Sequence, residues 1–482
     1  MIFSRILGFF YLINLFFKVN SFVPLKPTFI KPSGLKPTIL IQNNPINKNT
    51  EILEKIVDPP TKFPISGFYG LIGPKIDYKN VSSLFDLFTG DGIIQGMFLE
   101  NGTATFTQGL INTEKRQFEN THHLQSHSKN VFITLIHMIL NYLRIIPNML
   151  GVANTAFLKV PKINITNTYA LFERDMPYEI RIDSSNKKID TIKRQNIPFL
   201  STFSGHSKVI NGNIETIEYN ILNNRVKWYQ LNTDFKKLNE IHIQMKYIPM
   251  VHDFYSDNQY ILLIDSPIKI DLPNIFLKKI PLKFDKSEPT FIYLIEKSTG
   301  KIETYKIERS LYIFHYSDVK IKENTINILS PFYDNIDYNK VLHHGKYRRL
   351  RIERQTGSTQ LFKYRELEPL NLDFPVILWN GSVKQHILRN IEDGRINGFY
   401  ILEKTDIVKK IIFEEYFICG EPGIFYIERD NNKKTNQPVL VCFGIHEITK
   451  TQYFIMVNLE TDEQIKYPIS YPLFIGFHSI VL

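Results

Sequence analysis

The sequence predicts an all-β protein, on the strength of two observations. From about residue 60 onward, short runs rich in β-branched and aromatic residues follow one another, as in "YILLIDSPIKID" and "QYFIMVNLETDEQIKYPI". Gly, Asn, Asp or Pro separate these runs, and the triplets "STG" (298–300) and "ETD" (460–462) predict hairpin turns. So many short strands suit a pair of sandwiches, a solenoid or a propeller, and no repeat of fixed period is visible to choose between them.

The first 21 residues predict a signal peptide. Arg5 precedes an apolar run at 6–17, and the small residue Ser21 suits cleavage directly after it. The apolar run is too short to span a bilayer comfortably.

Residues 22–59 predict a transit-peptide-like segment or a linker. They contain several Lys, Thr and Pro residues and no acidic residue before Glu51. A signal peptide followed by such a segment resembles the two-part leader of algae with secondary plastids. We therefore expect a plastid location, with the secretory pathway, the ER lumen or the cell exterior as the alternative.

Residues 60–482 are expected to form one domain with a helical insertion at about 130–150. That segment, "NVFITLIHMILNYLRIIPNML", is long, apolar and compatible with a helix. Four polar residues interrupt it: His137, Asn141, Arg144 and Asn148. They favour a buried or interfacial helix over a membrane span.

The net charge of +10 does not by itself indicate a nucleic-acid partner, and we expect none. The one dense basic stretch, "HHGKYRRLRIERQ" at 343–355, alternates like a strand and predicts a solvated basic face. Cys419 and Cys442 are the two cysteines, and both lie in apolar, strand-like text. They predict two buried free thiols, with no disulfide framework and no zinc-binding cysteine pattern.

Thirteen histidines raise the question of a metal site. His123 and His127 are four residues apart, but their setting is polar and has no nearby acid, which does not favour a metal site. His343 and His344 lie in the basic stretch and are expected to be solvated.

Four other histidines share a distinct context, because each stands at the edge of an apolar, β-like run in a separate segment: His206, His252, His315 and His478. Taken singly, each would suit a satisfied histidine of the core. Together they suggest that four strands bring one imidazole each to a common point. The axis of a propeller is such a point.

Several motifs then resemble the carotenoid cleavage dioxygenase family, and its plant-type members above all: "GVANTAFL", "TNTYALFERDMPYEIRI", "GHSKV", "MVHDF", "IFHYSD", "CGEPGIF" and "GFHS". The stretch "FYGLIGPKI…LFTGDGIIQGMFLENGTATF" is similar to the family's opening blade, so the resemblance covers about 60–482. It implies a seven-bladed β-propeller with a helical or loop cap over a central metal site.

The resemblance also implies the site residues. One Fe²⁺ per chain would be held by His206, His252, His315 and His478. Carboxylates behind three of these histidines would be Glu173, Asp373 and Glu421. Asp373 stands where the family usually has Glu, and its shorter side chain puts the hydrogen bond in question. Gln95 replaces a histidine that is common in plant members and is not a ligand.

The implied activity is the addition of both atoms of O₂ across one double bond of a carotenoid or apocarotenoid, which gives two aldehyde or ketone products. No protein nucleophile is needed, and the sequence contains no GxSxG, HExxH or P-loop motif. A non-oxidative retinoid isomerohydrolase and a catalytically silent carotenoid-binding propeller are the alternatives. The apolar segment at 130–150 is expected either to contact a membrane peripherally or to pack over the propeller.

Overall fold

The computed structural model describes residues 52–56, 63–76, 81, 83–100, 103–122, 131–163, 165–276, 279–427 and 437–482. The predicted signal peptide, most of the segment at 22–59, and the pair His123 and His127 lie outside these residues.

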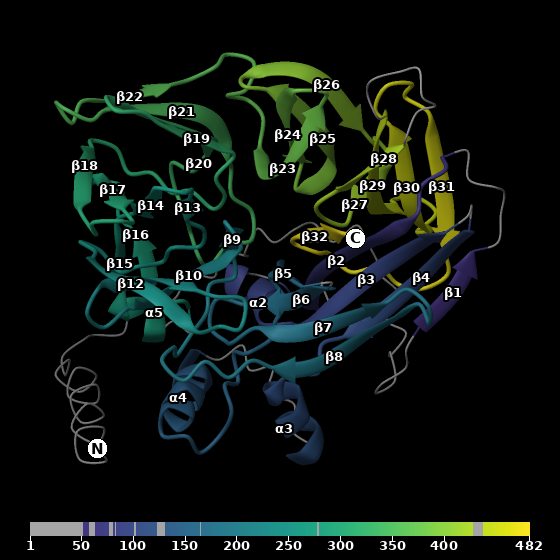
Figure 1. Ribbon diagram of the computed structural model, residues 1–482, viewed down its shortest axis with the longest axis horizontal. Helices are drawn as coiled ribbons and strands as arrows, with labels where there is room; N and C mark the ends of the chain where they lie inside the picture. Colours follow the sequence, from purple (N-terminus) through teal and green to yellow (C-terminus); the bar gives the residue numbers. More distant parts are fainter. Residues whose placement is uncertain are drawn as a thin grey trace.

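The strands form seven blades arranged in a ring (Figure 1), so the predicted seven-bladed β-propeller is confirmed. Blade 1 has the order β1-β4-β3-β2-β32 and comprises β1 (Ile52–Ile56), β2 (Gly67–Lys75), β3 (Asp91–Glu100), β4 (Thr103–Leu110) and β32 (Ser479–Val481). Its strand β1 lies N-terminal to residue 60, so the blade extends into the segment predicted to be a linker.

The next three blades follow in chain order. Blade 2 contains β5 (Ala156–Lys162), β6 (Ile165–Leu171), β7 (Tyr178–Asp183) and β8 (Lys188–Arg194). Blade 3 contains β9 (Lys208–Ile210), β10 (Asn213–Asn220), β11 (Arg225–Leu231) and β12 (Lys237–Gln244). Blade 4 contains β13 (Tyr255–Ser256), β14 (Tyr260–Asp265), β17 (Thr290–Glu296) and β18 (Ile302–Ile307), and a separate pair is formed by β15 (Ile268–Ile270) and β16 (Leu282–Phe284).

The last three blades complete the ring. Blade 5 contains β19 (Asp318–Ile321), β20 (Thr325–Phe332), β21 (Lys346–Glu353) and β22 (Thr359–Phe362). Blade 6 contains β23 (Leu372–Asn380), β24 (Val383–Glu392), β25 (Arg395–Glu403) and β26 (Asp406–Ile412). Blade 7 contains β27 (Tyr416–Ile418), β28 (Gly423–Ile427), β29 (Gln437–His446), β30 (Gln452–Asn458) and β31 (Gln464–Ile469).

The hydrophobic core lies between the blades. Each neighbouring pair of blades shares one cluster of buried apolar side chains, from the cluster of blades 1 and 2 around to that of blades 7 and 1. Both faces of a blade are therefore buried, which explains why many of the strand sequences are almost continuously apolar. The two cysteines belong to these layers: Cys419 and Cys442 are buried and free, as predicted.

The ring is closed by two distant parts of the chain. Strand β32 pairs antiparallel with β2, with Gly70 opposite Ile480. Backbone hydrogen bonds join Phe68 and Leu482 in both directions, at 2.8 and 2.9 Å. The last strand thus completes the first blade.

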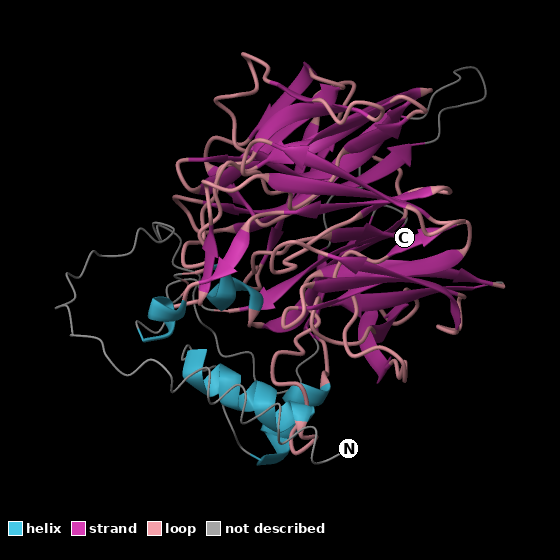
Figure 2. Ribbon diagram, turned by 90° about the vertical axis from the view of Figure 1, so that its left-hand side faces the viewer, coloured by secondary structure: helices cyan, strands magenta, loops and turns pink. Residues whose placement is uncertain are grey.

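The helices lie together on one side of the propeller (Figure 2) and comprise α2 (Leu84–Phe88), α3 (Glu114–His122), α4 (Val131–Tyr142) and α5 (Leu272–Phe276). Helix α2 begins with a capping box, in which Ser83 and Asp86 bond each other's backbone N–H. Helix α4 confirms the predicted helix within 130–150. Among the described residues, no helix is both long enough and apolar enough to cross a membrane.

The basic stretch at 343–355 contains the strand β21, Lys346–Glu353, but the prediction of a solvated basic face is wrong for Arg348. Its side chain is 1% exposed, and its guanidinium is paired with Asp334 at 2.7 Å and with Glu368 at 2.5 Å. Both faces of this blade pack against neighbours, so a basic residue there is buried with acidic partners. The prediction also fails for His343, which is partly buried, whereas the neighbouring His344 is exposed.

Candidate metal centre

Four histidines stand one to three residues before the inner strands of four blades. His206 precedes β9, His252 precedes β13, His315 precedes β19 and His478 precedes β32. Each of these strands is the end strand of its sheet that lies nearest the axis (Figure 1). The segments that lead into these strands therefore bring four imidazoles together.

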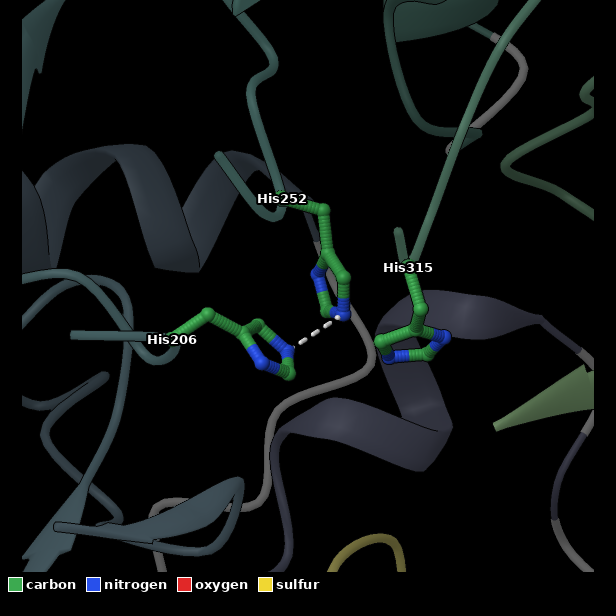
Figure 3. Close-up of side chains that lie close together, drawn as sticks. All are labelled: His206, His252 and His315. Carbon is green, nitrogen blue, oxygen red and sulfur yellow. Dashed lines mark hydrogen bonds between the residues drawn. The ribbon is translucent and has the colours of Figure 1, made fainter. Parts of the chain in front are cut away.

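The imidazoles face one another closely. Nε2 of His206 lies 3.0 Å from Nε2 of His252 (Figure 3). One ring nitrogen from each of His206, His252 and His315 lies within 4.8 Å of the others, so these three histidines can hold a metal ion. The ring of His478 lies 4.7 Å from that of His206 and 5.0 Å from that of His315, which makes it a fourth candidate.

Carboxylates stand behind three of the imidazoles. Nδ1 of His252 contacts Glu173, Nδ1 of His315 lies 2.9 Å from Asp373, and Nδ1 of His478 lies 3.1 Å from Glu421. Nδ1–H donates a hydrogen bond to the carboxylate, and this tautomer leaves the lone pair of Nε2 free to face the axis. Each of the three carboxylates that the resemblance implies thus lies beside Nδ1 of one histidine.

The shorter acid at position 373 does make its hydrogen bond. Oδ1 of Asp373 accepts from Nδ1 of His315 and also from the backbone N–H of Phe374 at 2.8 Å. Oδ2 accepts from the hydroxyl of Tyr333 at 2.5 Å. These additional donors hold the carboxylate against the imidazole, and the sequence did not identify Tyr333.

The electrostatics favour a neutral imidazole at His206 and at His315. Burial, reinforced by the neighbouring histidines, holds the pKa of His206 well below its usual value, and burial likewise lowers the pKa of His315. Burial would also lower the pKa of His252, but the charge and hydrogen bond of Glu173 outweigh it and raise that pKa. Nε2 of His315 is buried without a hydrogen-bond partner among the described residues, as a nitrogen reserved for a metal would be.

A mostly apolar cavity opens onto the histidines. Its lining includes His252, His315 and His478, and helix α2 contributes Leu84 and Phe88. The Phe88 ring lies 6.4 Å from the His252 ring. Further apolar lining comes from Phe314, Val341, Leu342, Ile391, Phe417 and Ile475. Such a cavity suits an apolar ligand beside the histidines.

Three residues near the histidines were not predicted from the sequence. Phe374 has a left-handed backbone with φ 57°, and its ring lies 4.4 Å from that of His315. Arg389 and His343 line the same cavity. Burial lowers the pKa of His343, which corrects the expectation that this residue is solvated. None of the three stands in a motif that could have identified it.

Gln95 has a structural role. Its amide donates to the carbonyl of Phe474 at 2.8 Å and accepts from the N–H of the same residue at 2.7 Å. It thereby holds the segment that leads to His478, and it does not line the cavity.

Comparisons with known proteins agree with this architecture. The family model described as "Retinal pigment epithelial membrane protein" matches residues 60–480. The carotenoid 9,10(9',10')-cleavage dioxygenase 1 of Arabidopsis thaliana is 22% identical over 450 residues, which cover 84% of this chain and 78% of the relative. The probable carotenoid cleavage dioxygenase 4, chloroplastic, of the same plant is 21% identical over 445 residues, with 82% and 72% covered.

Two solved structures share the fold. Cobalt-substituted Synechocystis ACO superposes with a TM-score of 0.67 at 14% identity and covers 90% of this chain and 96% of its own. The lignostilbene dioxygenase of Pseudomonas brassicacearum superposes with a TM-score of 0.70 at 14% identity, with 96% and 100% covered.

Proposed function

The chain belongs to the family that unites RPE65 with the carotenoid cleavage dioxygenases, and from that premise we propose that it is an iron-dependent dioxygenase. It binds one Fe²⁺ through His206, His252, His315 and His478. It cleaves one double bond of a carotenoid or apocarotenoid with O₂. The observation that carries this proposal is the convergence of four imidazoles, three of them backed by carboxylates, at the wall of an apolar cavity.

One set of residues holds the metal, and a second set, in the cavity, holds the substrate. When bound, Fe²⁺ supplies the redox chemistry that O₂ requires for reaction with a double bond. Glu173, Asp373 and Glu421 fix the orientation of three imidazoles and offset the charge of the ion in a buried site. No side chain needs to act as a nucleophile, because both oxygen atoms of O₂ end in the two carbonyl products.

The cavity provides the selectivity. Its apolar side chains exclude water and hold a polyene along its length, so the double bond nearest the histidines is the one that reacts. Helix α2 contributes to the wall beside His252, through Leu84 and Phe88.

The test uses purified protein, a panel of carotenoids and ¹⁸O₂. Two carbonyl products, each carrying one labelled oxygen, are expected. Release of a single alcohol without O₂ consumption would instead indicate the isomerohydrolase chemistry. Protein that binds the polyene but holds no iron under iron-replete conditions would indicate a silent binding propeller.

We further propose peripheral membrane contact through helix α4. Its side chains Ile133, Ile136 and Met138 are between 38% and 40% exposed, and Ile145 just beyond the helix is 63% exposed. A group of exposed apolar side chains on one helix suits the boundary of a bilayer, where carotenoids reside.

We also propose a plastid location, directed by the leader at 1–59. A relative described as chloroplastic supports it. A fluorescent fusion of residues 1–59 should be imported into plastids, and its retention in the secretory pathway would contradict the proposal.

A further inference from the structure

The guanidinium of Arg389 is buried and has no hydrogen-bond or ion-pair partner in the described part of the chain. Arg389 lies on β24, directly opposite Asp373 of β23, and lines the cavity with the histidines. The residue is 9% exposed, and its side chain makes no hydrogen bond or ion pair with any described residue. Its Nε is buried without a partner. Burial lowers the pKa of this guanidinium, and the charges of Asp373 and Glu421 offset that effect only in part.

The two nearest carboxylates are already engaged elsewhere. Both oxygens of Asp373 accept hydrogen bonds from His315, Phe374 and Tyr333. Both oxygens of Glu421 are bonded as well, Oε1 by His478 and Oε2 by Ser479. Neither carboxylate therefore accepts a hydrogen bond from the side chain of Arg389.

The guanidinium is held in a defined orientation. Its Cζ lies 3.7 Å from the centre of the Phe374 ring, and this ring lies 4.9 Å from that of His478. Stacking fixes the plane of a guanidinium and leaves its N–H edges free for a ligand. The free donors thus lie one aromatic ring away from the metal-binding histidines.

We propose that Arg389 binds a carboxylate at the end of the polyene substrate, which makes a polyene acid the preferred substrate class. The carboxylate accepts two parallel hydrogen bonds from the guanidinium, and the apolar side chains of the cavity hold the polyene. This inference rests on the proposed function, since it assigns the substrate of the same site.

The test compares two probes that share one polyene and differ only in the end group, retinoic acid and retinol. Binding to iron-loaded protein is measured without O₂, so that no turnover occurs. The wild type should bind retinoic acid at least about tenfold more tightly than retinol. Arg389→Met should abolish that preference and keep its iron. Arg389→Lys keeps the charge but not the paired geometry, so it should lose most of the preference.

Arg349→Met is a matched control. The Nε of Arg349 is also buried without a partner, and its guanidinium stacks on Phe362 at 4.4 Å, but it does not line the cavity. This variant should keep the wild-type preference. Palmitic acid carries a carboxylate without a polyene, and it should bind more weakly than retinoic acid. Equal or tighter binding would point to a fatty acid as the ligand and overturn the proposal.

Three other results would also overturn it. The first is equal binding of both retinoids by the wild type, and the second is a preference that survives Arg389→Met or Arg389→Lys. The third is loss of iron in Arg389→Met, which would make Arg389 part of the metal centre. Cleavage of a neutral carotenoid without any preference for acids would refute this inference alone. A preference for acids in a protein that cleaves nothing would refute the proposed function alone.

Discussion

Asp373 accepts a hydrogen bond from Nδ1 of His315 at 2.9 Å, across two neighbouring blades. The acceptor lies on β23 of blade 6, and the histidine precedes β19 of blade 5. The bond therefore couples the position of an imidazole of the candidate metal centre to the packing of one blade on the next. Both side chains are nearly fully buried, at 6% and 5% exposure.

Asp373→Asn should keep the fold and weaken metal retention by roughly 10–100-fold. The amide still fills the space, but it removes a negative charge close to the ion. Chelator competition on iron-loaded protein measures the change. Asp265→Asn serves as the control, because Asp265 is also buried and accepts from the backbone N–H groups of Lys246 and Tyr247, not from a histidine. Unchanged metal affinity in Asp373→Asn would contradict this role.

The four histidines could be predicted from the sequence because each stands in a short motif beside its own strand. Tyr333 and Arg389 could not, since their positions depend on which strands meet. Arg389 reaches the cavity through the register of β24 on β23, and Tyr333 reaches Asp373 from a different blade. The burial of Arg348 was missed for the same reason, because its partners Asp334 and Glu368 are distant in the sequence.

Removal of a single imidazole should empty the metal centre. Wild-type protein is expected to hold about one iron per chain, and His206→Ala, His252→Ala and His315→Ala should each hold little or none, because the remaining nitrogens leave the ion under-coordinated. Elemental analysis of protein made under iron-replete conditions measures this. His242→Ala, an exposed histidine on β12, should keep its iron. Stoichiometric zinc without iron in the wild type would contradict the assignment of iron.

His386 should make the fold sensitive to acid. Burial and the charge of Lys384 lower its pKa from 6.5 to about 4. The unfolded chain therefore binds more protons than the folded chain between these values, so stability is full above pH 6.5 and falls as the pH drops toward 4. The shift corresponds to roughly 3 kcal/mol at most. His386→Leu should flatten this part of the pH dependence, as measured by denaturant unfolding, and parallel curves for both proteins would contradict the prediction.

Helix α4 should carry the affinity for membranes. The triple variant Ile133→Ser, Ile136→Ser and Met138→Ser should reduce binding to phosphatidylcholine vesicles by at least about tenfold, because three exposed apolar side chains no longer enter the bilayer. Vesicle co-sedimentation measures the loss. A control triple variant changes exposed apolar residues elsewhere to serine: Ile163, Ile165 and Leu222. Equal losses in the two variants would argue against a specific role for α4.

The C-terminal segment should have two separable roles, as a metal ligand and as the strand that closes the ring. The backbone carbonyl of His478 accepts from the N–H of Ile72 at 3.0 Å, and this bond survives His478→Ala. That variant should fold normally and lose iron and activity. Ile480 is 4% exposed in the core between blades 1 and 2, so Ile480→Ala should cost about 2–4 kcal/mol of stability and keep the iron.

Deletion of residues 478–482 should combine both defects. It removes the imidazole, the pairing of β32 with β2, and the backbone bonds between Leu482 and Phe68. The free energy of unfolding should therefore fall by more than in Ile480→Ala, and the iron content should match that of His478→Ala. Denaturant unfolding and elemental analysis of the three proteins separate the two roles. A truncated protein that keeps its iron and its full activity would show that His478 is not a ligand and that β32 is not needed to close the propeller.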